Sequence, residues 1–333
     1  MLPPALPIGA QPALPVGAQP ALIVENLSLA IGPAQVVDRI GFAVAPGEVL
    51  SLVGESGCGK SLTAAAIMRL LPDAVRQTGG SIRLGAEDIC AYPERRMQQL
   101  RGRRLSMIFQ EPQAALDPLS PIGAQIAEAL RQPASQARPA VLRMLRDVGI
   151  SDPERRIDQY PFELSGGMCQ RVMIATALIA RPAVLLADEP TTALDVTIQA
   201  QILDLLRRLA TERQTAVVLI THDMGVVADI ADRVAVMYAG RIAETGPTEA
   251  LFAAPRHPYT ALLLASIPRL TDEPKSKLAV IEGRVPTPAE FGPGCRFASR
   301  CPLADQRCTQ ETPPLRPIGE NRLTACFHAE RVA

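Results

Sequence analysis

Short apolar segments separated by turn residues occupy the first third of the chain. Residues 22–30 and 36–44 alternate apolar and polar side chains on either side of a Gly-Pro pair, which predicts two antiparallel strands. Residues 48–54 form a largely apolar run that passes through a glycine-rich turn into helix-forming residues, and residues 104–109 form a further apolar run. We therefore expect strands here, one of them buried and leading directly into a helix.

Helical periodicity prevails between residues 121 and 180, and strands and helices then alternate. We expect strands at 183–188, 214–220 and 232–239, and helices at 196–211 and 223–231. Strands separated by helices indicate a parallel sheet and an α/β fold. Because the helical block interrupts this alternation, we interpret it as an inserted helical subdomain.

The two ends of the chain differ from its body. The first 20 residues contain the repeats PALPIGAQ and PALPVGAQ, whose prolines exclude regular helix or sheet and which lack the basic region of a signal peptide. Near the other end, Pro, Gly, Cys and charged residues prevail. We expect a disordered repeat leader (1–21), a main α/β domain (22–268) containing the helical subdomain (about 111–180), and a Cys-rich C-terminal extension (269–333).

Composition excludes several classes of protein. Lys plus Arg and Asp plus Glu both number 34, so the formal charge is zero and no broad basic surface for nucleic acid is expected. Aromatic residues make up only 3% and Trp is absent, which disfavours base stacking. The hydrophobic share of 47% excludes wholesale disorder, and no apolar run reaches the roughly 20 residues of a membrane-spanning helix.

The glycine-rich turn matches the phosphate-binding P-loop. It consists of Gly54, Glu55, Ser56, Gly57, Cys58, Gly59, Lys60 and Ser61. Glycines allow successive backbone N–H groups to converge on phosphate oxygens, and the following helix contributes the positive end of its dipole. We expect Lys60 to neutralise the β- and γ-phosphates and the Ser61 hydroxyl to bind Mg²⁺.

Polar residues at the ends of the following strands complete a nucleotide-hydrolysis site. Asp188 and Glu189 end an apolar strand, and we expect Asp188 to face the metal and Glu189 to orient or deprotonate the attacking water. Gln110 ends the strand at 104–109 and offers an amide to Mg²⁺ or to the water. His222 follows the next strand, at the sheet edge where ligands bind, and is expected to sense the γ-phosphate.

A second small-residue turn opens a later helix. It consists of Leu164, Ser165, Gly166, Gly167 and Met168, and is another anion-binding device. Because the nucleotide already has its P-loop, this turn is best explained as completing the site of a partner. The order of these motifs resembles that of ABC ATPases from Leu22 to the C-terminus. The resemblance implies an ABC ATPase fold and adds a dimer loop of Ala193, Leu194 and Asp195.

Longer segments narrow the resemblance. FQEPQAALDP at 109–118, LSGGMCQRVMIATAL at 164–178, RHPYTALLLASIPRL at 256–270 and the ending at 281–308 are similar to the ATP-binding subunits of dipeptide and oligopeptide importers. Met168, where many ABC proteins carry Gln, is similar to one of the two paralogous ATPases of those importers. Ile31 stands where ABC ATPases usually place an adenine-stacking aromatic residue, which affects base selectivity rather than hydrolysis.

The resemblance implies an ATP-driven motor with defined partners. It implies ATP and Mg²⁺ as ligands, an ATP-sandwich heterodimer with a paralogous ATPase, two integral membrane permease subunits and a periplasmic or surface solute-binding protein. It places the chain peripherally on the cytoplasmic face of the bacterial plasma membrane. Nickel or another small solute stays open as the cargo, because nickel importers share much of this sequence.

Two other classes of function account for the sequence less well than a transport motor does. Soluble ABC proteins that act on DNA or ribosomes generally have two cassettes or large basic insertions, whereas this chain has one cassette and no net charge. A regulator that only binds ATP is disfavoured because Lys60, Asp188, Glu189 and His222 are all present.

Four of the seven cysteines lie close to the C-terminus. Cys295, Cys301, Cys308 and Cys326 have the spacing C-x5-C-x6-C-x17-C. Four thiolates suit Zn²⁺ or an iron–sulfur cluster, although the paired C-x2-4-C motif of structural zinc sites is absent. Disulfides are disfavoured in a reducing cytoplasm. The resemblance implies a [4Fe–4S] cluster; Zn²⁺ and the absence of any metal stay open.

Overall fold

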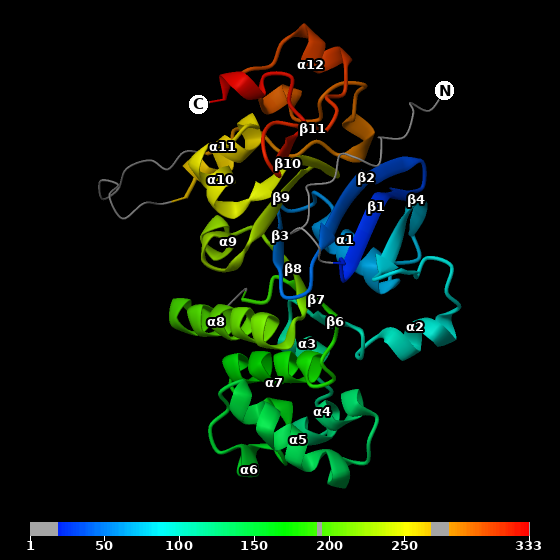
Figure 1. Cartoon of the computed structure of the whole chain (residues 1–333), viewed down its shortest axis with the longest axis vertical. Coiled ribbons are helices and arrows are strands. Elements are labelled where there is room, and N and C mark those ends of the chain that lie inside the picture. The colour runs from blue at the N-terminus through cyan, green and yellow to red at the C-terminus, as the bar shows by residue number, and fades with distance from the viewer. Residues whose placement is uncertain (1–18, 192–194, 268–279, 333) are drawn as a thin grey trace. The chain divides into compact units, whose positions relative to one another are not determined.

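The computed structural model describes residues 19–191, 195–267 and 280–332, which form two compact units (Figure 1). The first unit comprises the described residues up to Ala45, Leu50–Cys90 and those from Thr221 onward; the second comprises Pro46–Val49 and Ala91–Ile220. Residues 1–18 of the expected leader (1–21) and two residues of the expected dimer loop, Ala193 and Leu194, lie outside the described residues.

An antiparallel sheet forms part of the first unit. Its strand order is β2-β1-β4-β5, with β1 at Leu22–Ile31, β2 at Ala34–Val44, β4 at Val75–Leu84 and β5 at Glu87–Asp88. The register of β1 and β2 runs from Leu22 opposite Val44 to Ile31 opposite Ala34, which confirms the predicted antiparallel pair. Strand β4 was not predicted, because two glycines and several half-exposed polar residues interrupt its apolar pattern.

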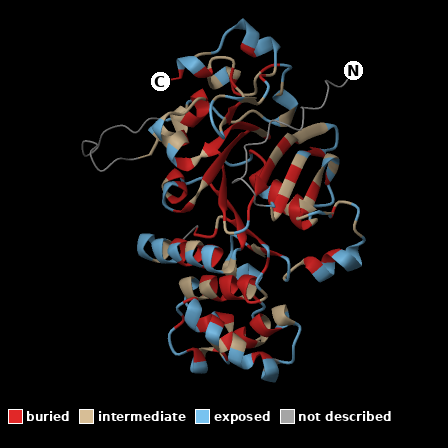
Figure 2. Ribbon diagram, in the orientation of Figure 1, coloured by how far each residue is buried: buried red, intermediate tan, exposed pale blue. Residues whose placement is uncertain are grey.

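A mixed sheet carries the glycine-rich turn in the same unit. Its order is β11-β12-β10-β9-β3, with β3 at Val49–Val53, β9 at Arg233–Tyr238, β10 at Arg241–Pro247, β11 at Arg316–Pro317 and β12 at Leu323–Thr324. Strands β3 and β9 are parallel and buried throughout, whereas β9 and β10 are antiparallel (Figure 2). Residues 316–324 therefore add two short strands to the sheet that carries the turn.

Short helices follow the strands of the first unit. They are α1 (Lys60–Met68), α9 (Met224–Ile230), α10 (Thr248–Ala253) and α11 (Pro258–Ala265). The C-terminal residues contribute α12 (Gln306–Gln310) and the 3₁₀ helices η2 (Pro288–Glu290), η3 (Ala298–Arg300) and η4 (Ala329–Arg331). Strand β3 and helix α1, on either side of the turn, match the prediction.

A parallel sheet forms the centre of the second unit. Strands β6 (Leu105–Ile108), β7 (Val184–Asp188) and β8 (Ala216–Thr221) pair in the order β8-β7-β6. Every residue of β7 and β8 is buried, which explains their continuous apolar runs. Helix α8 (Val196–Arg213) connects these two strands, and the predicted parallel strands are confirmed.

The remainder of the second unit is helical. It contains α2 (Glu94–Leu100), α3 (Pro112–Ala115), α4 (Ile122–Leu130), α5 (Ala134–Asp147), α6 (Pro153–Arg156), η1 (Pro161–Glu163) and α7 (Gly166–Leu178). Helices α4, α5 and α7 pack against one another, which confirms the predicted helical block. Among the described residues, no helix combines the length and the apolar character that crossing a membrane requires.

Aromatic side chains, rare in this sequence, gather in the core of the first unit. Tyr238, Tyr259 and Phe297 are at most 3% exposed. The ring centroid of Phe297 lies 5.0 Å from that of Tyr238 and 5.4 Å from that of Tyr259. Edge-on contacts of this kind add to the free energy gained by burial. Phe297 thus brings a large side chain from the C-terminal part of the chain into this core.

We expect Phe297→Ala to lower the free energy of unfolding by about 3–5 kcal/mol, because it removes a buried ring and leaves a cavity. Urea unfolding of the full chain measures the change, and Phe297→Leu should lose less. The control is Phe162→Ala, since Phe162 is 73% exposed, and its effect should stay within about 0.5 kcal/mol. Equal effects of the two alanine variants would contradict this packing.

Candidate functional site

The glycine-rich turn fits tightly against the strand beside it. Gly54 has φ +150°, and a Cβ there would lie 2.2 Å from the Met237 carbonyl oxygen. Gly59, at φ +100°, precedes α1, and a Cβ there would lie 2.8 Å from Val37 Cγ2. Side chains are therefore excluded from both ends of the turn. The Gly240 amide donates to the Cys58 carbonyl at 3.0 Å and holds the middle of the turn in place.

Lys60 brings a cation to this turn at the start of α1. It is 6% exposed, and its ammonium donates to the carbonyl oxygens of Gly54 at 2.6 Å and Glu55 at 3.1 Å. Ser61, the next residue, is exposed in the first turn of the helix. A cation beside a helix N-terminus and a loop of backbone amides forms a surface suited to phosphate groups.

Glu55 has two partners that are distant in sequence. Its backbone N–H donates to the Tyr259 hydroxyl at 2.9 Å, and its carboxylate accepts from both terminal nitrogens of Arg300, at 2.6 and 3.0 Å. These partners lie 204 and 245 residues along the chain. Sequence reasoning missed both contacts, and no local pattern signals them.

In the second unit, the structure brings Gln110 and Glu189 together. The Gln110 amide donates to the Glu189 carboxylate at 3.1 Å. Parallel pairing of Ile108 with Ala187 explains this, since both residues continue from adjacent strand ends. Glu189 has φ +45°, a strained conformation for a residue with a side chain, and its N–H donates to Ile220 O at 2.9 Å. Asp188, the last residue of β7, is 7% exposed.

The second small-residue turn caps a helix as expected. Ser165 is the N-cap of α7, and its hydroxyl accepts from the Met168 N–H at 3.4 Å. Gly166 is exposed and Gly167 half-buried, whereas Leu164 is buried. The buried Gln170 amide donates to the Pro190 carbonyl, which ties α7 to the segment after β7.

Three further expected site residues lie at the edges of elements. Asp195 is the N-cap of α8 and accepts from Ile198 N at 2.9 Å. His222 is exposed after β8, in the first unit with the P-loop. Ile31, at the end of β1, is 42% exposed. Gln110, Asp188, Glu189 and the small-residue turn belong to the second unit.

The four C-terminal cysteines line a single pocket in the first unit. Cys295, Cys301, Cys308 and Cys326 face it together with Phe297, Phe327 and His328. All four are free thiols, and the Cys295 N–H donates to Cys308 O at 2.8 Å. Burial raises the pKa of each thiol, that of Cys326 to about 11, and neighbouring thiols add to the effect at Cys295, Cys301 and Cys326. A bound cation would reverse this cost by stabilising the thiolates.

The spacing of the thiols can be compared with the geometry of a zinc site. Tetrahedral Zn²⁺ with Zn–S bonds of about 2.3 Å holds its sulfur ligands roughly 3.8 Å apart. Within the described residues, one group of three potential ligand atoms lies within 4.8 Å of one another, and it is Asp305, Cys308 and His328 rather than any three of the thiols. Among the described residues, no three of these thiols therefore have the close spacing that a single Zn²⁺ ion imposes on its ligands.

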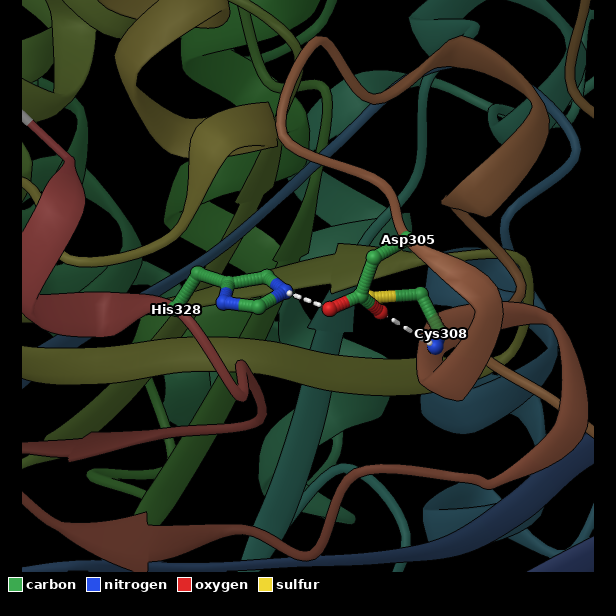
Figure 3. Close-up of side chains that lie close together, drawn as sticks. All are labelled: Asp305, Cys308 and His328. Atoms are coloured by element: carbon green, nitrogen blue, oxygen red, sulfur yellow. Dashed lines mark hydrogen bonds and ion pairs between the residues drawn. The ribbon is translucent and has the colours of Figure 1, made fainter.

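The Asp305, Cys308 and His328 group is explained without a metal (Figure 3). Asp305 is the N-cap of α12, and one of its carboxylate oxygens accepts from the Cys308 N–H at 2.9 Å. The other oxygen lies 3.0 Å from His328 Nε2. The hydrogen bond from Cys308 is the main reason why the pKa of Asp305 lies below its usual value. Both oxygens are thus already engaged in fixing the end of the helix.

Comparisons with known proteins relate the chain to ABC transporters. Residues 37–192 match the family described as ABC transporter, and residues 243–308 match the family described as oligopeptide/dipeptide transporter, C-terminal region. The chain is 49% identical to a probable peptide ABC transporter ATP-binding protein of Sinorhizobium fredii, over 84% of this chain and 85% of the relative.

Two further proteins are informative. The chain is 51% identical to the dipeptide transport ATP-binding protein DppD of Bacillus subtilis, over 75% of this chain and 76% of DppD. Among solved structures, the dimeric ATP-binding cassette MJ0796 in a post-hydrolysis state with ADP and Pi is similar, with a TM-score of 0.61 and 25% identity. That similarity covers 68% of this chain and 98% of MJ0796.

We expect stability to fall in acid because of His257, the N-cap of α11. Its Nδ1 accepts from the Tyr259 N–H at 3.1 Å, and burial lowers its pKa to about 4 from 6.5. The unfolded chain takes up the proton first, so the free energy of unfolding drops as pH falls from about 6.5 to 4, by on the order of 3 kcal/mol. Urea titrations at several pH values measure it.

His257→Asn keeps a capping acceptor without a group that titrates in this range. The variant should therefore lose less stability than the unmodified chain between those two pH values. The same slope in both proteins would contradict the assignment to His257.

Proposed function

The chain belongs to the family of ABC transporter ATP-binding proteins, and on that premise we propose that it is the ATP-hydrolysing motor of a bacterial dipeptide or oligopeptide importer. Two similarities support the cargo class: the relatives named as peptide and dipeptide transport ATP-binding proteins, and the match to the oligopeptide/dipeptide C-terminal region. In this proposal ATP hydrolysis by the chain powers solute movement through separate membrane subunits.

The hydrogen bond between Gln110 and Glu189 is the observation that carries the proposed chemistry. It holds a carboxylate in a defined direction at the end of a buried strand, as a group that orients or deprotonates water requires. Glu189 therefore activates the attacking water, and Gln110 positions it. Asp188 supplies a hard oxygen ligand for Mg²⁺.

The remaining ATP contacts follow from residue chemistry. Backbone amides of residues 54–61 bind the phosphates, and Lys60 neutralises the β- and γ-phosphates. The Ser61 hydroxyl is a second oxygen ligand for Mg²⁺, and His222 contacts the γ-phosphate. The support is the strand, turn and helix around Gly54 and Gly59, where side chains are excluded from the turn.

In the proposed dimer, the second phosphate-binding turn (residues 164–168) contacts the nucleotide of the partner subunit. Ser165 and the N-terminus of α7 bind the ATP held by a paralogous ATPase subunit, and the loop 193–195 lies at that dimer contact. The similar cassette MJ0796 is dimeric with ADP and Pi, which supports such an arrangement. Two integral membrane permeases complete the transporter at the cytoplasmic face of the plasma membrane, and a solute-binding protein supplies the cargo.

We propose the following division of the chain into domains. Residues 22–268 form the ABC ATPase domain, with the helical subdomain at about 111–180. Residues 1–21 form a leader and residues 269–333 a Cys-rich C-terminal extension.

We also propose that Cys295, Cys301, Cys308 and Cys326 hold a [4Fe–4S] cluster. The pocket that all four thiols line supports a metal centre shared by them. When bound, such a cluster neutralises the thiolates and cross-links segments of the extension.

We expect Glu189→Gln to keep ATP binding and to abolish turnover. The amide retains the shape of the side chain but cannot take a proton, so ATPase activity of the assembled transporter should fall by at least about 100-fold. The ATP dissociation constant should change by less than about threefold. Glu212→Gln, at an exposed carboxylate on α8, is the matched control and should leave both quantities unchanged. Undiminished hydrolysis in Glu189→Gln would refute the role.

Anaerobic purification tests the cluster. We expect a brown protein with broad visible absorbance and about four iron and four sulfide per chain. Cys308→Ser should lose the absorbance, whereas Cys90→Ser, at a thiol outside the pocket, should keep it. A colourless protein with stoichiometric zinc would overturn the cluster in favour of zinc.

A further inference from the structure

The first two cysteines of the pocket flank a five-residue segment that reaches back into the body of the first unit. This segment, residues 296–300, contains two arginines and Phe297. Arg296 donates to the Ala239 carbonyl, and Phe297 packs between Tyr238 and Tyr259. Arg300 extends to the phosphate-binding turn. The thiol site and the turn are therefore joined by one short stretch of chain.

Arg300 has an acceptor for each of its five N–H groups. Nε donates to Glu282 O at 2.8 Å, and the terminal nitrogens donate to Ile281 O at 3.0 Å and the Tyr238 hydroxyl at 3.3 Å. The other two N–H groups make the paired bonds to Glu55. The Arg300 side chain is 4% exposed. A planar guanidinium whose N–H groups are all hydrogen-bonded is held in one position. The paired bonds from Arg300 therefore hold the Glu55 carboxylate in one position as well.

Glu55 is held from a second direction by Tyr259. The Tyr259 hydroxyl accepts the Glu55 N–H, and its ring is fully buried in contact with Tyr238 and Phe297. Glu55 immediately follows Gly54, where the turn begins, so the direction in which the turn leaves β3 depends on these two contacts. Lys60 also donates to the Glu55 carbonyl at 3.1 Å. Displacement of Glu55 would therefore move the cation as well as the loop.

The other side of the same segment faces the thiols. Phe297 and Ala298 line the pocket with Cys295 and Cys301. The Ala298 N–H donates to Cys295 O at 3.0 Å, and Cys301 N donates to Ala298 O at 3.3 Å. Arg300 directly precedes Cys301 in the chain. One peptide bond therefore joins the residue that carries a pocket thiol to the residue whose guanidinium holds Glu55.

We propose that Arg300 is a positioning residue for the phosphate-binding turn, through which a filled thiolate site strengthens ATP binding. The proposal rests on the nucleotide and thiolate sites proposed above. Because coupling between two ligands is reciprocal, ATP must in turn stabilise the bound metal centre. The C-terminal extension is then a working part of the nucleotide site.

A variant series in the full, anaerobically purified chain tests the positioning role. Arg300→Met removes the donors and keeps much of the volume, and we expect the ATP dissociation constant to rise at least tenfold by calorimetry. Glu55→Gln keeps the other Arg300 contacts, so it is a milder variant and should raise the constant about threefold or more. Combining both changes should add little to Arg300→Met, because the two residues act through one contact.

The matched control is Arg284→Met. Arg284 makes a bidentate pair with Glu290 in the same extension, at 2.9 and 2.6 Å, but this pair is exposed and does not contact the turn. It should leave the ATP dissociation constant unchanged. In the assembled transporter, Arg300→Met should raise KM for ATP while kcat changes less than threefold, a split that general loss of folded protein would not produce.

The reciprocal measurement does not depend on hydrolysis. In the Glu189→Gln background, saturating MgATP should slow the loss of iron to a chelator at least threefold, and Arg300→Met should abolish this protection while starting with the same iron content. Protection that persists in Arg300→Met, or unaltered ATP affinity in both Arg300→Met and Glu55→Gln, would overturn the proposal. Failure of the unmodified chain to bind ATP or to hold iron would instead refute the proposed function or the proposed cluster.

Discussion

The close approach of the phosphate-binding turn to the backbone of β9 constrains the rest of the first unit. A Cβ at Gly54 would lie 2.2 Å from the Met237 carbonyl oxygen, so turn and strand meet with no side chain between them. Strand β9 ends at Tyr238, and two residues later the Gly240 N–H donates to the Cys58 carbonyl in the turn. Since Tyr238 also packs against Phe297, the strand that fixes the turn fixes the C-terminal extension too.

Buried charge holds the extension to the remainder of the first unit. Three extension arginines each meet a carboxylate from an earlier part of the chain: Arg296 meets Asp38, Arg300 meets Glu55 and Arg322 meets Glu244. Burial opposes ionisation of Asp38, but its arginine neighbours outweigh this and lower its pKa. Loss of one partner from such a pair leaves an uncompensated buried charge, which is far more costly than loss of an exposed pair. A net charge of zero in the sequence therefore conceals ion pairs that join distant segments.

Local spacing predicted those parts of the fold and of the candidate site that are built from neighbouring residues. Strand β3, the turn and α1 follow one another without interruption, and β7 carries Asp188 at its end, so periodicity and composition suffice to find them. Strand β4 was missed because its glycines and half-exposed polar residues leave no apolar run. The contacts of Glu55 were missed for another reason. Tyr259 and Arg300 are 204 and 245 residues away, and only the folded sheet brings them to the turn.

Because these contacts differ so much in sequence separation, the phosphate-binding turn acquires them at different stages of chain synthesis. The bonds of Lys60 to Gly54 and Glu55 span six and five residues, so they can form as soon as the first strands exist. The Arg300 contact requires nearly the whole chain to have been synthesised, and closing so long a loop costs entropy that the buried aromatic cluster and the ion pairs offset. The phosphate-binding turn thus has a local shape that its glycines and lysine provide, and a direction that depends on the distant residues Tyr259 and Arg300. A nucleotide site completed in this way joins the start of the domain to its end.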